Sequence, residues 1–216
     1  MAERPRPLLI LGARTFAPVV ADLLASAPEY QVAAFVENLD QSRCSAKLEG
    51  LPVLWVDEIA QLADTHSAIC ALGSTKRKAL IEQAAEAGFR FATFVDSAAS
   101  VSRKATVGEG SIVSTGAVVA AHSTIGKHVL VNRGALIGHN VEIGDYVTIG
   151  PGANIAGFTR IKSGAHIGMG ANILEKRSID ESSVVAAGAL VNSDVAARTM
   201  VAGAPARVVK TNVDGL

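Results

Sequence analysis

The second half of the chain carries an aliphatic residue at every sixth position. From Val101 to Val191 all sixteen of these positions are Val or Ile, and no other phase of six shows this pattern. Helices repeat apolar residues every three or four positions and ordinary strands every two, so neither explains a strict period of six. Short strands joined by tight turns do, because a hexapeptide repeat is a signature of the parallel β-helix, in which three units complete a turn. The repeat therefore predicts a β-helix of about five coils.

The rest of each hexapeptide suits a narrow prism. The residue that follows the aliphatic is Gly in six units, which eases a turn at a corner. The position four after the aliphatic is mostly Ala, Ser, Val or Thr, and is expected to face a tight interior. Aromatic residues make up only 4% of the chain although hydrophobic residues make up 49%, so Val, Ile, Leu and Ala must fill the core.

The first half follows a different pattern, in which short apolar runs alternate with helical periodicity. Such alternation predicts a parallel α/β sheet, here a small Rossmann-like domain over residues 1–97 that precedes a β-helix domain over 98–216. Asp57 is expected to cap a short helix that ends at Leu62, and Ser74 to cap a helix that stops at Gly88. Strands are expected at 8–12, 31–38, 66–73 and 89–95, and the two longer helices at 13–26 and 74–88.

Two residues of this half suggest a nucleotide moiety. Gly12 directly follows the first strand, where backbone amides at a helix start favour phosphate. A dinucleotide fingerprint has three glycines, and the stretch LGARTFAP has one, which argues against NAD. Glu37 ends the second strand, where an acidic group often meets a ribose or a base. A solvated acidic strand end explains Glu37 equally well.

Charge and cysteine content exclude several classes of protein. Lys plus Arg equals Asp plus Glu at 20 each, so no bulk field attracts nucleic acid or an anionic membrane. The opening apolar run, LLIL, is too short for a signal peptide and is expected to form a strand. No run approaches the roughly 18 apolar residues of a membrane helix, so no membrane insertion is expected. Cys44 and Cys70 lack metal-binding spacing and predict two reduced thiols in a cytoplasmic protein with no metal.

Six stretches spread over both halves carry a resemblance to one family: LILGARTFAPVVADLL, FVEN, GSTKRKAL, AGFRFATFVDSAASVS, VNRGALIGHNVEIGD and VAGAPARVVK. In these stretches the chain resembles the NeuD/PglD-like bacterial sugar O- and N-acyltransferases, which join a Rossmann-like domain to a left-handed hexapeptide β-helix. The resemblance spans almost the whole chain. It implies a homotrimer with active sites between neighbouring β-helices, and acetyl-CoA as the co-substrate.

The resemblance also implies which residues form the site. His139, in LIGHNVEIG, matches the catalytic base, and Asn132 matches a neighbour that could orient the imidazole, although a corner Asn can equally be structural. The backbone amide of Gly157 is expected near the thioester oxygen. The implied acetyl-CoA contacts are Thr148, Ala156, Gly157, Met169, Ala187, Pro205, Arg207 and Lys210. The implied nucleotide-sugar contacts are Gly12, Arg14, Thr15, Phe16, Glu37, Asn38 and Gly73.

The cationic end of the chain has two explanations. Arg207 and Lys210 can meet the phosphates of the coenzyme in the segment that closes over its adenine end. A capping strand with a solvated tail is the alternative.

The chain departs from the family pattern at three places. Many members have Gly and His where this chain has Arg14, Thr15 and Phe16, so the Arg14 side chain could make the phosphate contact. Two aspartates are usual where Glu37 and Asn38 stand, which leaves the base and sugar open. Near the catalytic histidine, Asn140 replaces an acidic neighbour and Thr148 replaces a second histidine, so an acyl-CoA contact and the surroundings of the base differ.

Histidine chemistry fits the implied reaction. Imidazole titrates near neutral pH, so it can take a proton from an attacking amine or hydroxyl while a donor holds the oxyanion. His139 lies two residues after Ile137, at a corner, and its ring is expected to point outward. His122 lies nearly one coil earlier and could assist from the same edge. His128 and His166 are expected to be solvated turn residues, and His66 a strand-edge residue.

Four functions remain in view. The favoured one is an acetyl-CoA-dependent N-acetyltransferase acting on a nucleotide-linked amino sugar in surface-polysaccharide biosynthesis. O-acetylation of a free sugar acid, as in sialic acid O-acetyltransferases, needs the same histidine and is the alternative within that class. A β-helical carbonic anhydrase would need His122, His128 and His139 to converge on zinc, although the first two fall on different faces of the prism. The fourth is a trimeric scaffold without catalytic activity.

Overall fold

The computed structural model describes residues 5–216, and these fall into two compact units. Residues 1–4, part of the segment considered as a signal peptide, lie outside the described residues. The N-terminal unit runs to Gly73 and includes Arg77–Ala92, and the β-helix unit contains Ser74–Lys76 and Thr93–Leu216. This division falls slightly before the boundary expected at residue 97, because the segment after Ala92 already pairs with the first coil.

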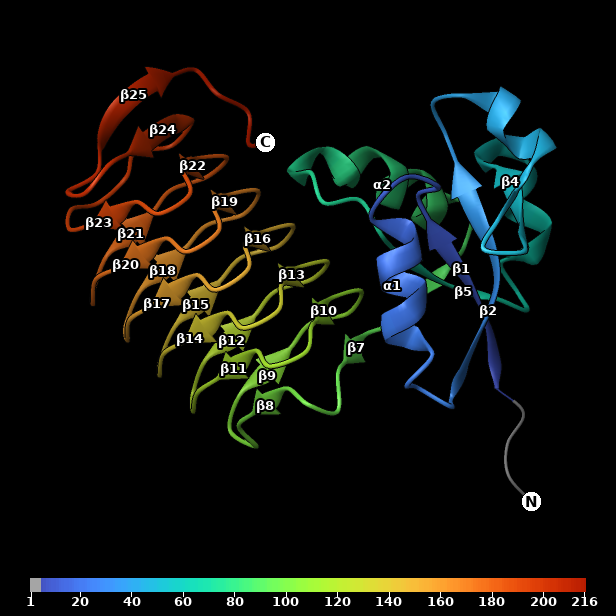
Figure 1. Cartoon of the computed structure of the whole chain (residues 1–216), viewed down its shortest axis with the longest axis horizontal. Coiled ribbons are helices and arrows are strands. Elements are labelled where there is room, and N and C mark those ends of the chain that lie inside the picture. The colour runs from blue at the N-terminus through green and yellow to red at the C-terminus, as the bar shows by residue number, and fades with distance from the viewer. Residues whose placement is uncertain (1–4) are drawn as a thin grey trace. The chain divides into compact units, whose positions relative to one another are not determined.

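The N-terminal unit is built on a six-stranded sheet in the order β3-β4-β2-β1-β5-β6. Figure 1 labels β1, β2, β4 and β5 of this sheet. Strand β1 lies between β2 and β5 and runs parallel to both. Its apolar run, residues 8–11, is fully buried as predicted. Only β3 is antiparallel to its neighbour. The strands are β1 (Arg6–Leu11), β2 (Tyr30–Glu37), β3 (Lys47–Leu48), β4 (Leu51–Trp55), β5 (Ser67–Cys70) and β6 (Arg90–Phe91).

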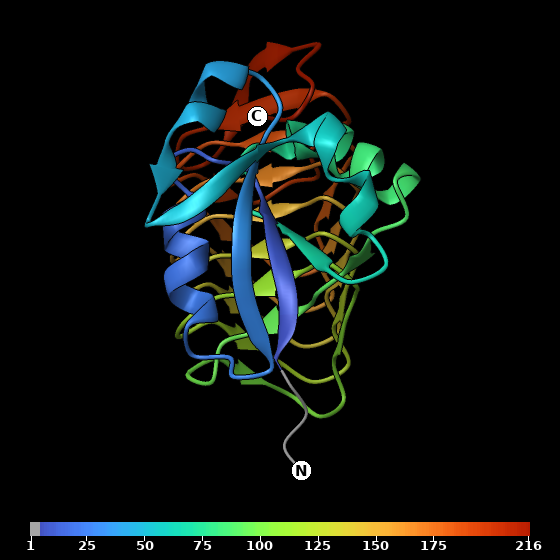
Figure 2. The same cartoon turned by 90° about the vertical axis from the view of Figure 1, so that its right-hand side faces the viewer.

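The helices of this unit are shorter than expected. Helix α1 spans Ala17–Leu24, since Pro18 fits only the first turn of a helix, and α1 packs against β1 and β2 (Figure 2). Helix α2 spans Lys78–Glu86 with Arg77 at its N-cap position. Ser74 caps the 3₁₀ turn before it instead, because its hydroxyl oxygen accepts the N–H of Lys76 at 3.2 Å. The remaining helical segments are 3₁₀ turns: η1 (Gln41–Ser45), η2 (Val56–Glu58), η3 (Ala60–Leu62) and η4 (Thr75–Arg77).

Two local expectations were wrong. The short helix expected to end at Leu62 is broken into η2 and η3, and Asp57 lies inside η2 instead of capping a helix. The strand expected over 89–95 splits, because β6 joins the sheet of the N-terminal unit whereas Phe94–Val95 pairs with Ile112–Val113 of the β-helix.

The β-helix unit is a left-handed parallel β-helix with three faces, as predicted. Val119 pairs with Ile137, and Ile137 with Ile155, so each coil takes 18 residues (137 − 119), or three hexapeptides. The stacked coils are visible in Figure 1.

The first face holds eight strands and ends in an antiparallel pair: β7 (Phe94–Val95), β10 (Ile112–Val113), β13 (Leu130–Val131), β16 (Thr148–Ile149), β19 (His166–Ile167), β22 (Val184–Val185), β24 (Thr199–Ala202) and β25 (Arg207–Thr211). The second face consists of β8 (Ser100–Val101), β11 (Val118–Val119), β14 (Leu136–Ile137), β17 (Asn154–Ile155), β20 (Asn172–Ile173) and β23 (Leu190–Val191). The third face consists of β9 (Thr106–Val107), β12 (Thr124–Ile125), β15 (Glu142–Ile143), β18 (Arg160–Ile161) and β21 (Ser178–Ile179).

The interior of the prism is as narrow as the small residues predict. The repeating aliphatic residues form one continuous buried column, and the residues four positions later, such as Ala135 and Ala153, are fully buried with them. A hydroxyl is tolerated here when its hydrogen bonds are satisfied. Ser123 donates to the carbonyl of Gly138 at 2.7 Å and accepts from the N–H of Val141 at 3.0 Å. No helix in the described part of the chain combines the length and apolarity needed to span a bilayer.

The three corners of the prism share a backbone conformation but not a composition. Each corner passes through a residue with φ near +60°, a region in which an L side chain costs about 1–2 kcal/mol and Gly nothing. At the corner we call the glycine corner these residues are Gly116, Gly134, Gly152, Gly170 and Gly188. At the histidine corner these residues are His122, Asn140, Phe158 and Lys176. We count the residue that precedes each of them as part of the histidine corner. At the third corner they are Gly110, His128, Tyr146, Gly164 and Ser182.

Candidate active site

His139 follows β14 at the histidine corner, and its side chain is exposed to solvent. Two neighbours hold the imidazole. Its Nδ1 lies 3.1 Å from Oδ1 of Asn140, and its ring meets that of Phe158 edge to face, with centroids 5.1 Å apart and planes at 89°. The ring is therefore fixed in orientation while part of it stays open.

Asn140 also decides which ring nitrogen can act as a base. An amide oxygen can only accept, so with Oδ1 facing the ring the proton of the neutral imidazole lies on Nδ1. The lone pair is then on Nε2. This tautomer is the one that a general base at Nε2 needs.

Gly157, one coil later, lies directly against the other side of the imidazole. A Cβ at this position would lie 2.9 Å from both Cε1 and Nε2 of His139, closer than real Cβ atoms come, so only glycine permits the observed ring position. The corner turn also leaves the N–H of Gly157 without a hydrogen bond to any of the described residues 5–216. A free backbone donor thus lies beside the nitrogen that can accept a proton, which suits oxyanion stabilisation.

A groove of about 790 Å³ opens beside the histidine corner along the third face. Asn140 and Phe158, which both touch His139, line it, and so does His122, which lies at the same corner as expected. The rest of the lining combines apolar residues such as Ile143 with the polar side chains of Thr124, Glu142 and Arg160.

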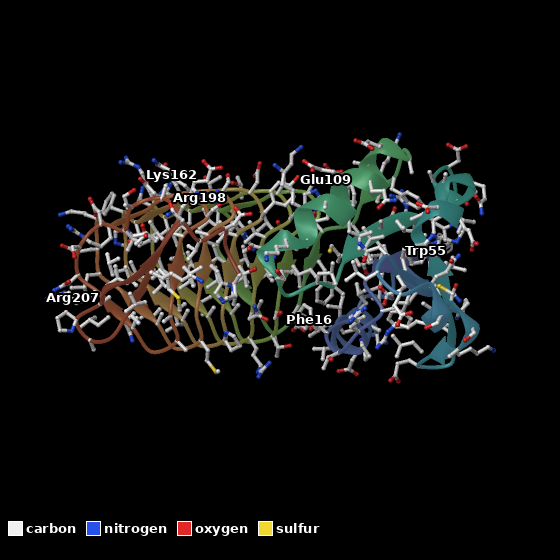
Figure 3. All side chains as sticks on the ribbon, turned by 90° about the horizontal axis from the view of Figure 1, so that it is seen from above. Phe16, Trp55, Glu109, Lys162, Arg198 and Arg207 are labelled. Atoms are coloured by element: carbon white, nitrogen blue, oxygen red, sulfur yellow. The ribbon has the colours of Figure 1, made fainter. Side chains whose placement is uncertain are left out.

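Ion pairs cross the strands of the third face. The Nε of Arg160 lies 3.4 Å from Oε2 of Glu142. The Nζ of Lys162, on the outer surface in Figure 3, lies 2.8 Å from Oδ1 of Asp180. The hydrogen bond from Lys162 holds the pKa of Asp180 below its ordinary value.

The N-terminal unit has a second candidate site at the carboxyl edge of its sheet. From β1 the chain continues to β2 and β4 on one side of β1, and it then returns to β5 on the other side of β1. Ligands of such sheets bind where the strand order reverses in this way. Gly12 follows β1 at a φ of +118°, and a Cβ there would lie 3.0 Å from Cδ2 of Leu72. Gly73 follows β5 and has open space around it. The sequence predicts a free N–H at Gly12, but this N–H donates a hydrogen bond to the carbonyl of Val36 at 2.8 Å.

Glu37 organises the same edge. It is only 2% exposed, so the interpretation as a solvated strand end is wrong. Its Oε1 accepts the N–H groups of Asn38 at 3.0 Å and Leu39 at 2.9 Å. Its Oε2 lies 3.5 Å from Nε of Arg14 and 3.8 Å from Nε of Arg43. No motif marked Arg43, since its position depends on how η1 folds back towards β2.

Comparisons with known proteins agree with both units. The PglD N-terminal domain signature matches residues 7–84, and the signature of the bacterial transferase hexapeptide (six repeats) matches residues 122–157. The acetyltransferase domain of PglB from Neisseria gonorrhoeae FA1090, in complex with acetyl coenzyme A, is 31% identical with a TM-score of 0.86, over 95% of this chain and 100% of that chain. The chain belongs to the NeuD/PglD-like sugar acyltransferases.

Two further solved structures are similar to this acyltransferase. A histidine-to-asparagine variant of perosamine N-acetyltransferase from Caulobacter crescentus, in complex with CoA and GDP-perosamine, is 27% identical with a TM-score of 0.88, over 94% of this chain and 97% of that one. WeeI from Acinetobacter baumannii AYE is 28% identical with a TM-score of 0.86, over 94% of this chain and 99% of that one. A search of curated proteins found no match.

Within one chain the acyltransferase gathers only part of the expected coenzyme site. Ala156 and Gly157 lie with His139 at the histidine corner. Asn132 belongs to the turn at the glycine corner, where its Nδ2 donates to the carbonyl of Ile149 at 2.8 Å. Met169, 60% exposed, and Ala187 also lie at the glycine corner.

The other expected coenzyme contacts are spread along the first face. Thr148 is buried in β16, at 4% exposure. Pro205, Arg207 and Lys210 are exposed at the end of the prism, where Figure 3 labels Arg207. A single prism thus separates these residues from the histidine corner.

The remaining histidines of the acyltransferase differ from expectation. His128 is 6% exposed and stacks on Tyr146 with ring centroids 5.4 Å apart, so it is not a solvated turn residue. His166 is half-buried within β19 and is not in a turn. His122 and His128 lie at different corners. Among residues 5–216, no three His, Cys, Asp or Glu side chains are grouped to hold a metal ion.

Proposed function

We propose that this acyltransferase transfers the acetyl group of acetyl-CoA to the amine of a nucleotide-linked amino sugar, a precursor of surface polysaccharide, with His139 as the general base. The observation that carries the proposal is the contact between the exposed His139 ring and Gly157, with Asn140 on the opposite nitrogen. Similar proteins support the choice of substrates, since one binds acetyl coenzyme A and another, a perosamine N-acetyltransferase, binds CoA and GDP-perosamine.

In this proposal each group has its own role. Nε2 of His139 removes the proton that the amine loses as its nitrogen attacks the thioester carbon. The carbonyl oxygen becomes an oxyanion, which the free N–H of Gly157 receives as a hydrogen-bond donor. The carbonyl then re-forms and the carbon–sulfur bond breaks. The sulfur takes the proton from His139, so coenzyme A leaves as the thiol and the base is regenerated. A positioned base is worth about 10²–10⁴ in rate, and one oxyanion donor about 10²–10³.

The N-terminal unit is proposed to hold the nucleotide at the edge formed by Gly12 and Gly73. Arg14 and Arg43 place two guanidinium groups there, and guanidinium forks match phosphate oxygens. Thr15, Phe16 and Asn38 are proposed to complete this site. Glu37 anchors both arginines, and its Oε2 accepts no hydrogen bond from any described residue, so it can accept one from a base or ribose.

A homotrimer is part of the proposal, because the expected site residues of one chain lie on two edges of the prism. Asn132, Met169 and Ala187 are at the glycine corner, whereas His139 and Gly157 are at the histidine corner. They come together if the glycine corner of one subunit faces the histidine corner of the next. Light scattering after gel filtration tests this: three copies of the 22.2 kDa chain are expected, and a monomer would contradict it.

The reaction itself is tested by coupled thiol release from acetyl-CoA with a panel of acceptors. The panel contains GDP-perosamine, UDP-linked 4-amino sugars and free sialic acids. Release with a nucleotide-linked amine is the expected result. Release with free sialic acid alone would support O-acetylation instead, and no release with any acceptor would contradict the enzyme assignment of the site.

A further inference from the structure

Phe158 is an unusual residue for its position. It is a large apolar side chain that remains 50% exposed, although the chain has few aromatic residues. Its φ is 59°, in the left-handed region that the glycine corner reserves for Gly. Both exposure and backbone strain disfavour a phenylalanine here, so the ring is retained for something other than folding.

The ring lies between His139 and open space. It contacts the imidazole edge to face at 5.1 Å and directly follows Gly157. It also lines the groove of about 790 Å³ along the third face. Phe158 thus contacts His139 on one side and lines this groove on the other.

The groove lies beside His139 on a side where no acetyl-CoA contact is expected. None of the expected acetyl-CoA contacts lines it, whereas Asn140 and Phe158 do. A transfer reaction brings two reactants to one base, so the acceptor approaches from the groove. The polar part of the lining suits it, because Thr124, Glu142 and Arg160 offer donors and acceptors in reach of hydroxyl groups.

We propose that Phe158 is a substrate-binding residue, and that the apolar face of the acceptor sugar packs against its ring beside His139. This inference rests on the proposed function. A pyranose ring presents C–H groups on its faces and hydroxyls around its rim, so it matches an exposed aromatic surface next to polar side chains. The contact with His139 then sets the distance between the sugar amine and Nε2.

The test separates the ring from the backbone strain. Phe158→Gly removes the ring and also relieves the left-handed conformation, so it should fold at least as well as the wild type. Lys176→Gly is the matched control, because Lys176 occupies the same corner one coil later with a φ of 60° and an exposed side chain. Phe158→Trp retains an aromatic face. For each protein we measure the KM for acetyl-CoA, the KM for the fastest acceptor of the panel, and the melting temperature.

Phe158→Gly should raise the acceptor KM about tenfold, leave the acetyl-CoA KM within about twofold, and keep or raise the melting temperature. Lys176→Gly should leave both KM values unchanged, and Phe158→Trp should stay close to the wild type. A wild-type acceptor KM in Phe158→Gly, or a rise confined to acetyl-CoA, overturns this inference alone. Absence of thiol release from the wild type with every acceptor overturns the proposed function and this inference with it.

Discussion

The glycine corner and the histidine corner turn the same coil with the same backbone, but they are built from different residues. Gly134 and Gly152 have φ values of 65° and 64°, and Asn140 and Phe158 have 56° and 59°. Where only a turn is needed, the chain uses the residue that makes it without strain. At the histidine corner side chains other than glycine occupy that conformation, at about 1–2 kcal/mol for most residue types, as His128, Tyr146 and Ser182 do at the third corner. The same turn can thus be made with or without strain, and two of the strained residues, Asn140 and Phe158, are in contact with His139.

Of the variants that test this comparison, His139→Ala is expected to have the largest effect on activity. Loss of the base should lower kcat/KM by a factor of about 10²–10⁴ in the thiol-release assay. The fold should be unaffected, because the side chain is exposed. His66→Ala, in the N-terminal unit, is the control and should retain wild-type turnover. A His139→Ala enzyme with near wild-type activity would favour a different base.

The pair Gly157→Ala and Gly134→Ala should divide activity from stability. A Cβ at Gly157 would push the His139 ring aside, and a misplacement of about 1 Å can cost up to about 100-fold in rate. The ring can move, so the free energy of unfolding should change little. At Gly134 a Cβ meets open space, but the φ of 65° makes alanine strained, so we expect a loss of about 1–2 kcal/mol in stability and a smaller loss of turnover than at Gly157.

Urea unfolding and thiol release, both measured on both variants, check this pair. The comparison between corners fails if Gly134→Ala loses as much turnover as Gly157→Ala, or if Gly157→Ala loses stability and keeps its activity.

Asn140→Asp should change the pH dependence rather than the maximum rate. A carboxylate next to the imidazole stabilises its protonated form, so a higher pH is needed to obtain the neutral base. The acid limb of the kcat/KM profile should therefore move up by about one pH unit. Asn and Asp both tolerate the left-handed conformation, so the fold should persist. Superimposable profiles would mean that the side chain at position 140 does not contact the ring during catalysis.

The smallest effect is expected on the face next to the histidine corner, from Asp180→Asn. Because Lys162 holds the pKa of Asp180 below its ordinary value of 3.8, the pair stabilises the fold above that pH and the contribution is lost as the pH falls further. The pair is largely exposed, so at pH 7 the loss should be under about 1 kcal/mol. Urea unfolding at pH 7 and near pH 3 should show the difference between variant and wild type shrinking in acid. A difference that grows in acid would contradict the assigned ion pair.

Much of the β-helix could be predicted because its signal is local and repeats. Each hexapeptide specifies one strand, one corner and one inward residue, so the pairing of Ile137 with Ile155 follows from counting. The structure of the N-terminal unit was harder to predict from the sequence. Its strands were found from apolar runs, but α1 and α2 begin later than their periodicity suggests, because Pro18 and a 3₁₀ turn before Lys78 set the true starts.

The residues of the candidate site likewise differ in how far the sequence predicts them. His139 and Gly157 could be identified from the sequence, but Phe158 and Arg43 could not, since nothing in the repeat or the strand pattern marks them. His128 was misjudged for a related reason. Corners of the repeat are usually exposed, but Gly110 one coil earlier leaves space for its ring and Tyr146 one coil later covers it.

The sequence alone determined the coil of this acyltransferase, the order of its two units and the histidine at a corner, because these depend on spacing along the chain. Only the tertiary structure decided that Asn140, Gly157 and Phe158 enclose one imidazole, and that Glu37 is buried between Arg14 and Arg43. The physical reason is that side-chain contact depends on rotamers and on the room left by neighbours in space, and a one-dimensional pattern contains neither.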